Sequence, residues 1–474
     1  MEKNAQPVRH IRFQASEQRF LLLLGDLLFA YLALFAALYI WALSDGSLHF
    51  SMQFLRERVP GWFYFLPLFW PLFLVELYDL SKAGDTRTTL KTVGLATLLA
   101  GGIYLMVYFI LPRAAMPPRL GAAFFIILVG LFTLAWRLVQ VRLFSAVSRQ
   151  RRVIIVGAGK AGTALVDEIT NQKVPPFNLL GLVDDDPEKQ GTRISGSPIL
   201  GNYAILNRLI EDLDVTDLIL AISNKMNHGM FQSILLAQES GINLTTMSEA
   251  YEELTHRVPI SLLESDWVIR AFLDKTPTGA FYRLLKRAMD VLGGLAGTIV
   301  LGLLYPLISA VIHMDSKGPA IYRQERLGLG GRPYMIYKFR TMKDSKDMAR
   351  EGLVTATNDP RVTRVGKFLR RSHLDELPQM INVLRGEMSL VGPRSERTEL
   401  VTVFQNIVPF YRARMLTKPG ITGWAQINQP YAETIEETAI KLEYDLYYIQ
   451  HANILMDFNI LLRTFGAVFG FKGR

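Results

Sequence analysis

The 474-residue sequence contains no cysteine. It therefore has no disulfide, no thiolate nucleophile, no zinc–thiolate site and no iron–sulfur cluster. Charged residues are also sparse, at 20% of the chain, whereas hydrophobic residues make up 50%. The formal net charge is nevertheless +9. This combination favours anionic lipid and phosphorylated substrates as partners and argues against nucleic acid.

Charge is scarcest in four apolar segments within residues 1–145. They cover about residues 20–43, 62–80, 90–111 and 120–139. Each approaches the roughly 20 residues that a helix needs to cross a bilayer, and aromatic residues gather at their ends. We therefore predict a four-helix transmembrane region over residues 1–145. The first twenty residues are polar and basic and precede a long apolar run, so we expect no cleavable signal peptide.

Lysine and arginine set the expected orientation of these spans. They are concentrated before the first span, between the second and third, and after the fourth. The positive-inside rule then places the N-terminus and everything after residue 142 in the cytoplasm. Asp26 lies within the first span, where a carboxylate either has a function or pairs with a neighbouring helix.

Residues 146–275 have the pattern of a Rossmann-like domain. A β-branched strand at 152–156 leads into a glycine-rich loop and an amphipathic helix, and a second strand ends at Asp184. The loop glycines are Gly157, Gly159 and Gly162. This arrangement is typical of a site where a pyrophosphate lies at the helix N-terminus and an acid holds a ribose. NAD or another nucleotide is the expected ligand. The alternative is that the glycines serve only close packing of helix against strand.

A redox enzyme or epimerase on this fold needs a Tyr-x-x-x-Lys pair within the Rossmann domain. The chain contains Tyr282 and Lys286 at that spacing. They lie outside the domain and beside an apolar segment, so we interpret the spacing as coincidence.

A fifth apolar segment, residues 291–312, is long enough to span a bilayer. A full crossing would place the rest of the chain, with its many basic residues, outside the cell. Pro306 interrupts the segment, and proline kinks or breaks a helix. A helix that enters and leaves the same side fits this break. A straight span remains the alternative, since membrane helices tolerate proline.

Beyond residue 318 the sequence becomes charged and rich in motifs. Asp375 and Glu376 are adjacent carboxylates that follow two arginines and precede an apolar helix. One interpretation is helix capping. The other is a site in which nearby cations keep a carboxylate ionised, as a nucleophile or metal ligand, and neutralise a diphosphate.

Several strings in this part of the chain resemble one family. They are Lys338-Phe-Arg-Thr-Met, Leu374-Asp-Glu-Leu-Pro-Gln, Gly392-Pro-Arg and Pro419-Gly-Ile-Thr-Gly-Trp-Ala-Gln. Residues 281–474 look like the monotopic phosphoglycosyl transferase superfamily, which loads sugars onto undecaprenyl phosphate. The whole chain is similar to the large polytopic members of the exopolysaccharide branch.

The resemblance implies the chemistry. Asp375 attacks the β-phosphate of a UDP-sugar and releases UMP, leaving a covalent glycosyl-phosphate that undecaprenyl phosphate then accepts. Glu376 acts as a base or orients groups, and Mg²⁺ bridges Asp375 and the diphosphate. Further positions match basic or polar motif positions and are expected to contact substrate: Lys338, Arg340, Arg370, Arg394 and Gln426.

The resemblance also implies an architecture and a location. We expect an α-helical membrane bundle, an α/β Rossmann-like domain, and an α+β transferase domain with a re-entrant hairpin about residues 288–314, broken at Pro306. The active site then faces the cytoplasm at the bacterial inner membrane. A homodimer and the transferred sugar stay open. Two competing functions are a nucleotide-sugar oxidoreductase or epimerase and a nucleotide-sensing membrane scaffold.

The sequence departs from the family pattern in three places. Tyr305 replaces the serine often found before the proline, Ser395 replaces a proline after Gly-Pro-Arg, and residues 428–430 replace an Asn-Gly-Arg string. These changes affect the helix break and an arginine contact that some relatives make.

Overall fold

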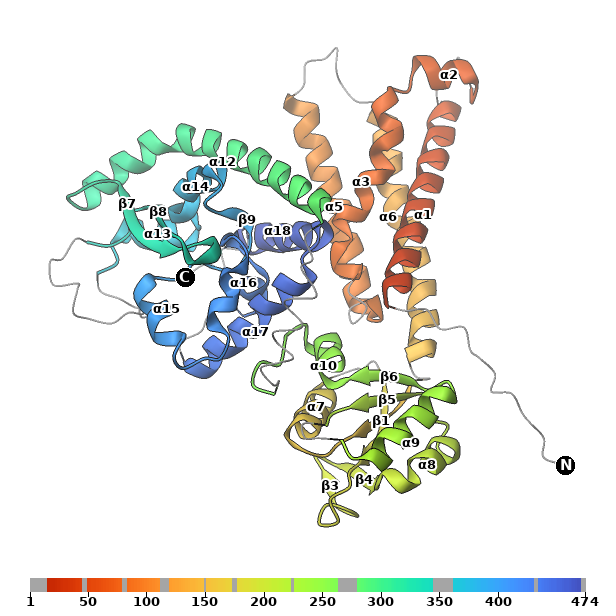
Figure 1. Cartoon of the computed structure of the whole chain (residues 1–474). Coiled ribbons are helices and arrows are strands. Elements are labelled where there is room, and N and C mark those ends of the chain that lie inside the picture. The colour runs from red at the N-terminus through yellow and green to blue at the C-terminus, as the bar shows by residue number, and fades with distance from the viewer. Residues whose placement is uncertain are drawn as a thin grey trace. The chain divides into compact units, whose positions relative to one another are not determined.

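The computed structural model describes residues 15–44, 49–78, 83–110, 119–148, 151–172, 177–222, 226–262, 279–343, 361–429 and 434–469. The chain divides into two compact units, Met1–Arg151 and Arg152–Arg474. Figure 1 traces the elements of both in chain order.

Three long apolar helices dominate the first unit. They are α1 (Ala15–Ser44), α5 (Thr86–Ile110) and α6 (Arg119–Ser148). They contain apolar stretches of 25, 24 and 24 residues, each long enough to cross a bilayer. Small residues let α1 and α6 approach closely, since a Cβ at Gly25 would overlap Trp136. This unit has the composition and the helix lengths of a membrane region.

The second expected span differs from the prediction. In place of one helix, the chain forms three short ones: η1 (Gly61–Phe65), α3 (Leu66–Phe73) and η2 (Val75–Tyr78). Pro67 and Pro71 lie within α3. Each proline removes a backbone donor and crowds the preceding turn, which explains why an apolar run of this length is divided. The short helix α2 (Met52–Glu57) precedes them.

Asp26 pairs with a neighbouring helix. Arg137 of α6 donates two hydrogen bonds to its carboxylate, and the Tyr78 hydroxyl donates a third at 2.7 Å. Arg137 also donates to the carbonyl of Leu77 at 2.9 Å. Asp26 and Arg137 are almost completely buried, and their ion pair gives each charge the partner that it needs there. Of the two alternatives, the contacts favour helix pairing.

The Rossmann-like part of the second unit has a six-stranded sheet in the order β3-β4-β2-β1-β5-β6, parallel except for β3. Its strands are β1 (Arg152–Val156), β2 (Asn178–Val183), β3 (Arg193–Ile194), β4 (Ser197–Gly201), β5 (Asp217–Leu220) and β6 (Asn243–Thr246). Its helices are α7 (Lys160–Asn171), η4 (Tyr203–Ile205), α8 (Leu206–Asp212), α9 (His228–Glu239) and α10 (Met247–Thr255).

Alternating residues of β1 build two cores in this sheet. Val153 and Ile155 pack with α7 and α10, whereas Ile154 and Val156 pack with α8 and α9. Figure 1 shows helices on both faces of the sheet accordingly. The doubly wound arrangement agrees with the fold predicted for this domain.

The part of the second unit for which the sequence predicts a transferase domain, called the transferase part below, begins with helix α12 (Ala280–Asp315) and the hairpin of β7 (Ile321–Leu327) and β8 (Pro333–Phe339). A parallel pair, β9 (Ser389–Val391) and β10 (Gly420–Thr422), follows. The other elements are η5 (Leu329–Gly331), α13 (Arg364–Arg371), η7 (Leu374–Gln379), α14 (Met380–Arg385), α15 (Thr398–Phe404), η8 (Tyr411–Leu416), α16 (Trp424–Asn428), α17 (Ile435–His451) and α18 (Ile454–Phe469).

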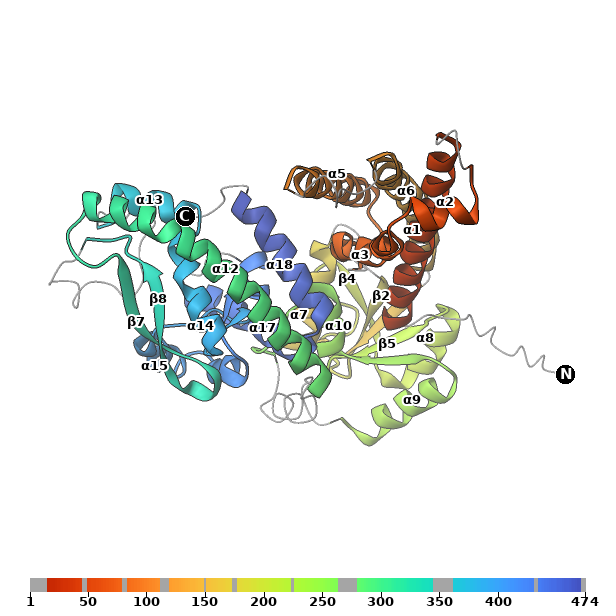
Figure 2. The same cartoon turned by 90° about the horizontal axis from the view of Figure 1, so that it is seen from above.

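Helix α12 differs from the expected hairpin. It runs for 36 residues and passes through Pro306 without leaving the helical conformation. A proline removes one hydrogen bond and bends a helix, but it does not by itself end one. Figures 1 and 2 show α12 lying along the transferase part, over α14 and β9.

The chain that leaves α10 joins the transferase core. Val258 and Ile260 are buried in one apolar cluster with Leu442 and Leu446 of α17. The backbone amide of Val258 donates to the carbonyl of Glu443 at 3.2 Å. The core of the transferase part therefore includes residues that the sequence assigned to the middle domain.

Candidate active site

The two adjacent carboxylates lie in the first turn of η7. His373, just before this turn, adopts a left-handed conformation with φ of 57°, and its carbonyl accepts the Glu376 amide at 3.2 Å. The left-handed residue redirects the chain after α13, so that Asp375 and Glu376 begin a new helical turn. Neither carboxylate occupies an N-cap position, because the N-cap residue is His373 for η7 and Gln379 for α14, and neither makes a capping side-chain hydrogen bond.

Two cations from distant parts of the chain converge on Glu376. Lys338 Nζ, on β8, donates to Glu376 Oε1 at 2.7 Å, and Arg394 Nη2, just after β9, donates to the same oxygen at 2.8 Å. Burial raises the pKa of Glu376, but Arg394 and Lys338 outweigh this and hold the pKa far below its usual range. Glu376 is therefore held in its carboxylate form, and its lowered pKa makes it a weak proton acceptor.

Asp375 is in the opposite situation. Among the residues that the structure describes, none donates a hydrogen bond to its carboxylate. Burial and the neighbouring charge of Glu376 raise the pKa of Asp375 to about 6, although Lys338, Arg394 and Arg370 act to lower it. A carboxylate without a hydrogen-bond donor, ionised near neutral pH and close to cations, has the properties of a nucleophile.

The other predicted substrate-binding residues have different positions. Arg394 keeps 40% of its side chain exposed while it binds Glu376, so it remains accessible to a ligand. Arg370 Nε donates to Thr341 Oγ1 at 2.9 Å and lies near enough to Asp375 to influence its pKa. These two arginines and Lys338 form the cationic surroundings that the sequence predicted for the two carboxylates.

Arg340 and Gln426 make structural contacts. Arg340 donates to the backbone carbonyls of Ser316 and Lys317 at 2.7 and 2.8 Å, which satisfies carbonyls at the end of α12. Gln426 Nε2 donates to the carbonyl of Ile421 at 3.0 Å. The structure does not connect either residue to Asp375 or Glu376 by a hydrogen bond.

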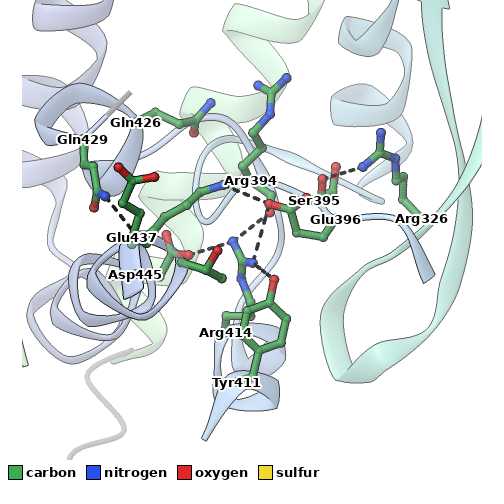
Figure 3. A network of polar contacts seen from close by, with 12 residues as sticks. Arg326, Arg394, Ser395, Glu396, Tyr411, Arg414, Gln426, Gln429, Glu437 and Asp445 are labelled. Atoms are coloured by element: carbon green, nitrogen blue, oxygen red, sulfur yellow. Dashed lines mark hydrogen bonds and ion pairs between the residues drawn. The ribbon is translucent and has the colours of Figure 1, made fainter. Parts of the chain in front are cut away.

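A second polar network, not predicted from the sequence, lies behind Arg394. Figure 3 shows Arg414 between Tyr411 and Asp445, and its guanidinium also donates to the carbonyl of Arg394 at 3.1 Å. Glu396 accepts from Lys441 at 2.9 Å. Burial raises the pKa of Glu396, but Lys441 and Arg414 outweigh it and lower the pKa to about 2. These contacts hold the chain around Arg394 in place.

The described residues around Asp375 offer few ligands for a metal ion. Within the described part of the chain, no three carboxylate, histidine or cysteine side chains cluster as a metal site. Lys338 and Arg394 both occupy Oε1 of Glu376, whereas no described residue donates a hydrogen bond to the oxygens of Asp375. Mg²⁺ commonly binds through one or two carboxylates together with substrate phosphates and water, so Asp375 fits this kind of ligand set.

The glycine-rich loop of the middle domain has the geometry that its pattern predicts. Gly157 has φ of +110°, and a Cβ at Gly162 would overlap the carbonyl of Gly157. Gly159 faces open space. Asp184 accepts the loop amide of Ala158 at 2.6 Å, so its carboxylate binds the loop itself in this structure.

Comparison with known proteins identifies the family. Residues 281–471 match the family model described as bacterial sugar transferase, and residues 74–246 match one described as CoA-binding domain. The UDP-glucose:undecaprenyl-phosphate glucose-1-phosphate transferase of Escherichia coli (strain K12) is 35% identical over 324 residues, which are 66% of this chain and 67% of that protein. The chain belongs to the bacterial sugar transferase family. This membership confirms the family predicted from the sequence.

Other members of the bacterial sugar transferase family match shorter stretches. The UDP-N-acetylgalactosamine-undecaprenyl-phosphate N-acetylgalactosaminephosphotransferase of Aeromonas hydrophila is 40% identical over 47% of this chain and 52% of its own length. The exopolysaccharide production protein PSS of Rhizobium leguminosarum bv. phaseoli is 36% identical over 38% of this chain and 93% of its length. The matches thus span about half to two thirds of the first two relatives and nearly all of the third.

Proposed function

We propose that this chain transfers a hexose-1-phosphate from a UDP-sugar to undecaprenyl phosphate and so initiates exopolysaccharide, capsule or O-antigen synthesis. The observation that carries the proposal is the convergence of Lys338 and Arg394 on Glu376, beside an Asp375 carboxylate to which no described residue donates a hydrogen bond. Relatives named for glucose-1-phosphate and N-acetylgalactosamine phosphate transfer support the reaction class.

The first half-reaction uses the contrast between the two carboxylates. An oxygen of Asp375 forms a bond to the β-phosphorus of the UDP-sugar, and the bond from that phosphorus to the bridging oxygen breaks, which releases UMP. Arg394 and Arg370 stabilise the phosphoryl oxygens as charge develops on them. Glu376 serves as an orienting group because its two cations keep it ionised.

The second half-reaction restores Asp375. A phosphate oxygen of undecaprenyl phosphate forms a bond to the phosphorus held on Asp375, and the bond to the aspartate oxygen breaks. The product is undecaprenyl-diphosphate-sugar. When bound, Mg²⁺ neutralises the diphosphate charge, and Asp375 is the residue that would hold it.

The proposal places the active site at the cytoplasmic face of the bacterial inner membrane, with α12 entering only one leaflet. Both halves of α12 pack on the transferase part: Gly293 lies against Leu390, and Ile312 is buried with Phe339 and Leu369. A helix of 36 residues is about 54 Å long, well beyond the roughly 30 Å of a bilayer core. A crossing helix would leave one of these two packed ends beyond the membrane.

The opposite side of α12 is apolar and exposed, as a lipid-contacting surface requires. Its exposed side chains include Leu292, Leu295, Leu303 and Leu307. This face supports membrane contact along the length of the helix.

The middle domain is proposed to bind a nucleotide at Gly157–Gly162, with Asp184 released from the loop when a ribose hydroxyl competes for it. Redox chemistry is not favoured there. Tyr282 and Lys286 have the Tyr-x-x-x-Lys spacing of such enzymes, but both bind the buried carboxylate of Asp457 in the transferase part.

Transfer of radiolabel tests the proposed function. Purified full-length protein in lipid is given a panel of labelled UDP-sugars, undecaprenyl phosphate and Mg²⁺, beside the Asp375→Asn variant. Lipid-linked label from one donor, lost in the variant, is the expected result and names the sugar. Absence of transfer from every donor by folded wild-type protein would leave the nucleotide-sensing scaffold as the better account.

A further inference from the structure

Helix α12 holds strand β9 through two charged side chains one helical turn apart. Asp290 accepts the backbone amide of Leu390 at 2.9 Å and the hydroxyl of Ser389 at 2.9 Å. Lys286 Nζ donates to the carbonyl of Val391 at 3.0 Å. A helix therefore satisfies backbone groups of β9 that a neighbouring strand would otherwise bind.

The other side of β9 is bound by β10. The amides of Ser389 and Gly392 donate to the carbonyls of Pro419 and Thr422, both at 2.9 Å. The three-residue strand is thus held on one side by a strand and on the other by side chains of α12. Such a short strand has few contacts of its own, so its position depends on these two supports.

A buried carboxylate balances the charge of Lys286. Asp457 on α18 accepts Lys286 Nζ at 2.9 Å, the hydroxyl of Tyr448 at 2.6 Å and the hydroxyl of Tyr282 at 2.8 Å. Asp457 and Tyr448 are almost completely buried. Since a buried ammonium is stable only when paired, this cluster fixes Lys286 in the orientation that reaches Val391.

Strand β9 leads directly to Arg394. Gly392 has no room for a Cβ, which would lie 2.3 Å from the carbonyl of Lys418, and Gly420 N donates to the carbonyl of Pro393 at 2.9 Å. The turn between Val391 and Arg394 is therefore packed tightly, and a displacement at Val391 is passed on to Arg394.

We infer that Lys286 and Asp290 are positioning residues that tie α12 to strand β9 and thereby place Arg394 beside Glu376. In sequence, Lys286 belongs to a basic group at the start of an apolar helix, the usual mark of a membrane flank. In the structure it binds a backbone carbonyl that leads to the active site. The position of the membrane-associated helix α12 therefore determines the position of Arg394 in the active site. This inference rests on the proposed function.

Three full-length variants in nanodiscs separate positioning from simple charge effects. Lys286→Met removes the bond to Val391. Arg283→Met removes a positive charge from the exposed side of the same helix start and serves as the matched control. Arg394→Met removes the group that Lys286 is inferred to place.

The transferase assay gives the first readout. Lys286→Met is expected to lower kcat/KM about tenfold to a hundredfold, since a displacement of about 1 Å costs up to about 10²-fold. Arg283→Met should keep wild-type activity. In an Arg394→Met background, Lys286→Met should lower kcat/KM by less than about a further twofold, because the effects of two substitutions that act through one group are not additive. An equal loss in Arg283→Met, or a full additional loss in the double variant, overturns the inference.

Hydrogen–deuterium exchange gives a second readout that needs no substrate. A peptide containing Leu390 and Val391 should exchange faster in Lys286→Met and in Asp290→Leu, and at the wild-type rate in Arg283→Met. Unchanged protection in the first two variants refutes the tie between α12 and β9. If wild-type protein shows no transfer at all, the proposed function fails, while this exchange measurement still decides the inference.

Discussion

Asp375→Asn is expected to stabilise the folded protein while abolishing its activity. The carboxylate of Asp375 is ionised at neutral pH, although burial and Glu376 raise its pKa from 3.8 to about 6. A shift of this size corresponds to roughly 2 pH units, or on the order of 1–3 kcal/mol once the strong coupling to Glu376 is allowed for. An uncharged amide of the same shape removes this cost.

The sign of the pH dependence follows from the raised pKa. Well below pH 3.8, Asp375 is protonated in both the folded and the unfolded states, so its ionisation costs nothing. As pH rises towards 6, the unfolded state loses its proton first, and stability is lost until the folded-state pKa is passed. The stabilising effect of Asp375→Asn should therefore be full at pH 8 and small at pH 4.5.

Thermal unfolding of both proteins in the same detergent at the two pH values measures this effect. The variant should unfold several degrees higher at pH 8, at about 2–4 °C per kcal/mol. Glu376→Gln is the matched control and should act in the opposite direction, because it leaves Lys338 and Arg394 without their shared carboxylate. A lower midpoint for Asp375→Asn at pH 8, or a gain independent of pH, would refute the reasoning.

Three further substitutions test other parts of the account. Arg340→Met should lower the unfolding midpoint and leave KM for the UDP-sugar unchanged, since Arg340 binds carbonyls at the end of α12. A raised KM without loss of stability would instead indicate that Arg340 binds substrate. His373→Gly should be more stable than His373→Ala by about 1 kcal/mol, because glycine adopts the left-handed conformation without cost, and equal midpoints would contradict this. Lys441→Met should destabilise the protein by about 3 kcal/mol at pH 7, because among the described residues Glu396 keeps only the longer ion pair with Arg414, at 3.7 Å. Because the paired Glu396 has its pKa lowered to about 2, this penalty should shrink as pH falls from 4.5 towards 2. Unfolding midpoints of wild type and variant at pH 7 and pH 3.5 measure the change, with Lys441→Arg as the control.

The local patterns of the sequence predicted much of the architecture. Long apolar runs predicted α1, α5 and α6, and the strand–glycine–helix pattern predicted the loop at Gly157. Both signals depend on neighbouring residues, so no knowledge of the tertiary structure is needed to interpret them. The second apolar run was harder because its total length satisfies a span, while Pro67 and Pro71 divide it.

The sequence predicted that Lys338 and Arg394 lie near the two carboxylates. It did not predict which carboxylate they bind. Adjacent letters in a sequence do not tell which carboxylate the cations bind. In the structure both cations bind Glu376 and leave Asp375 without a donor among the described residues. The distinct chemistry of the two groups therefore arises from contacts between segments 18 and 38 residues apart.

Basic residues were the least predictable group. Arg340 lies two positions after Lys338 in the same string, yet it binds backbone carbonyls instead of a carboxylate. Lys286 belongs to a basic group of the kind that flanks membrane helices, yet it contacts β9. Phosphate, carboxylate, backbone carbonyl and lipid headgroup all attract the same side chains, and only the tertiary structure distinguishes them.

The most direct test of the central claim is the covalent step at Asp375. Wild-type protein and Asp375→Asn are incubated with a UDP-sugar labelled on the β-phosphate, without lipid acceptor, and the intact protein is analysed by mass spectrometry. The account predicts that wild-type protein gains the mass of one sugar phosphate, located on Asp375, and loses it when undecaprenyl phosphate is added. Transfer to lipid by the Asp375→Asn variant at the wild-type rate would contradict it.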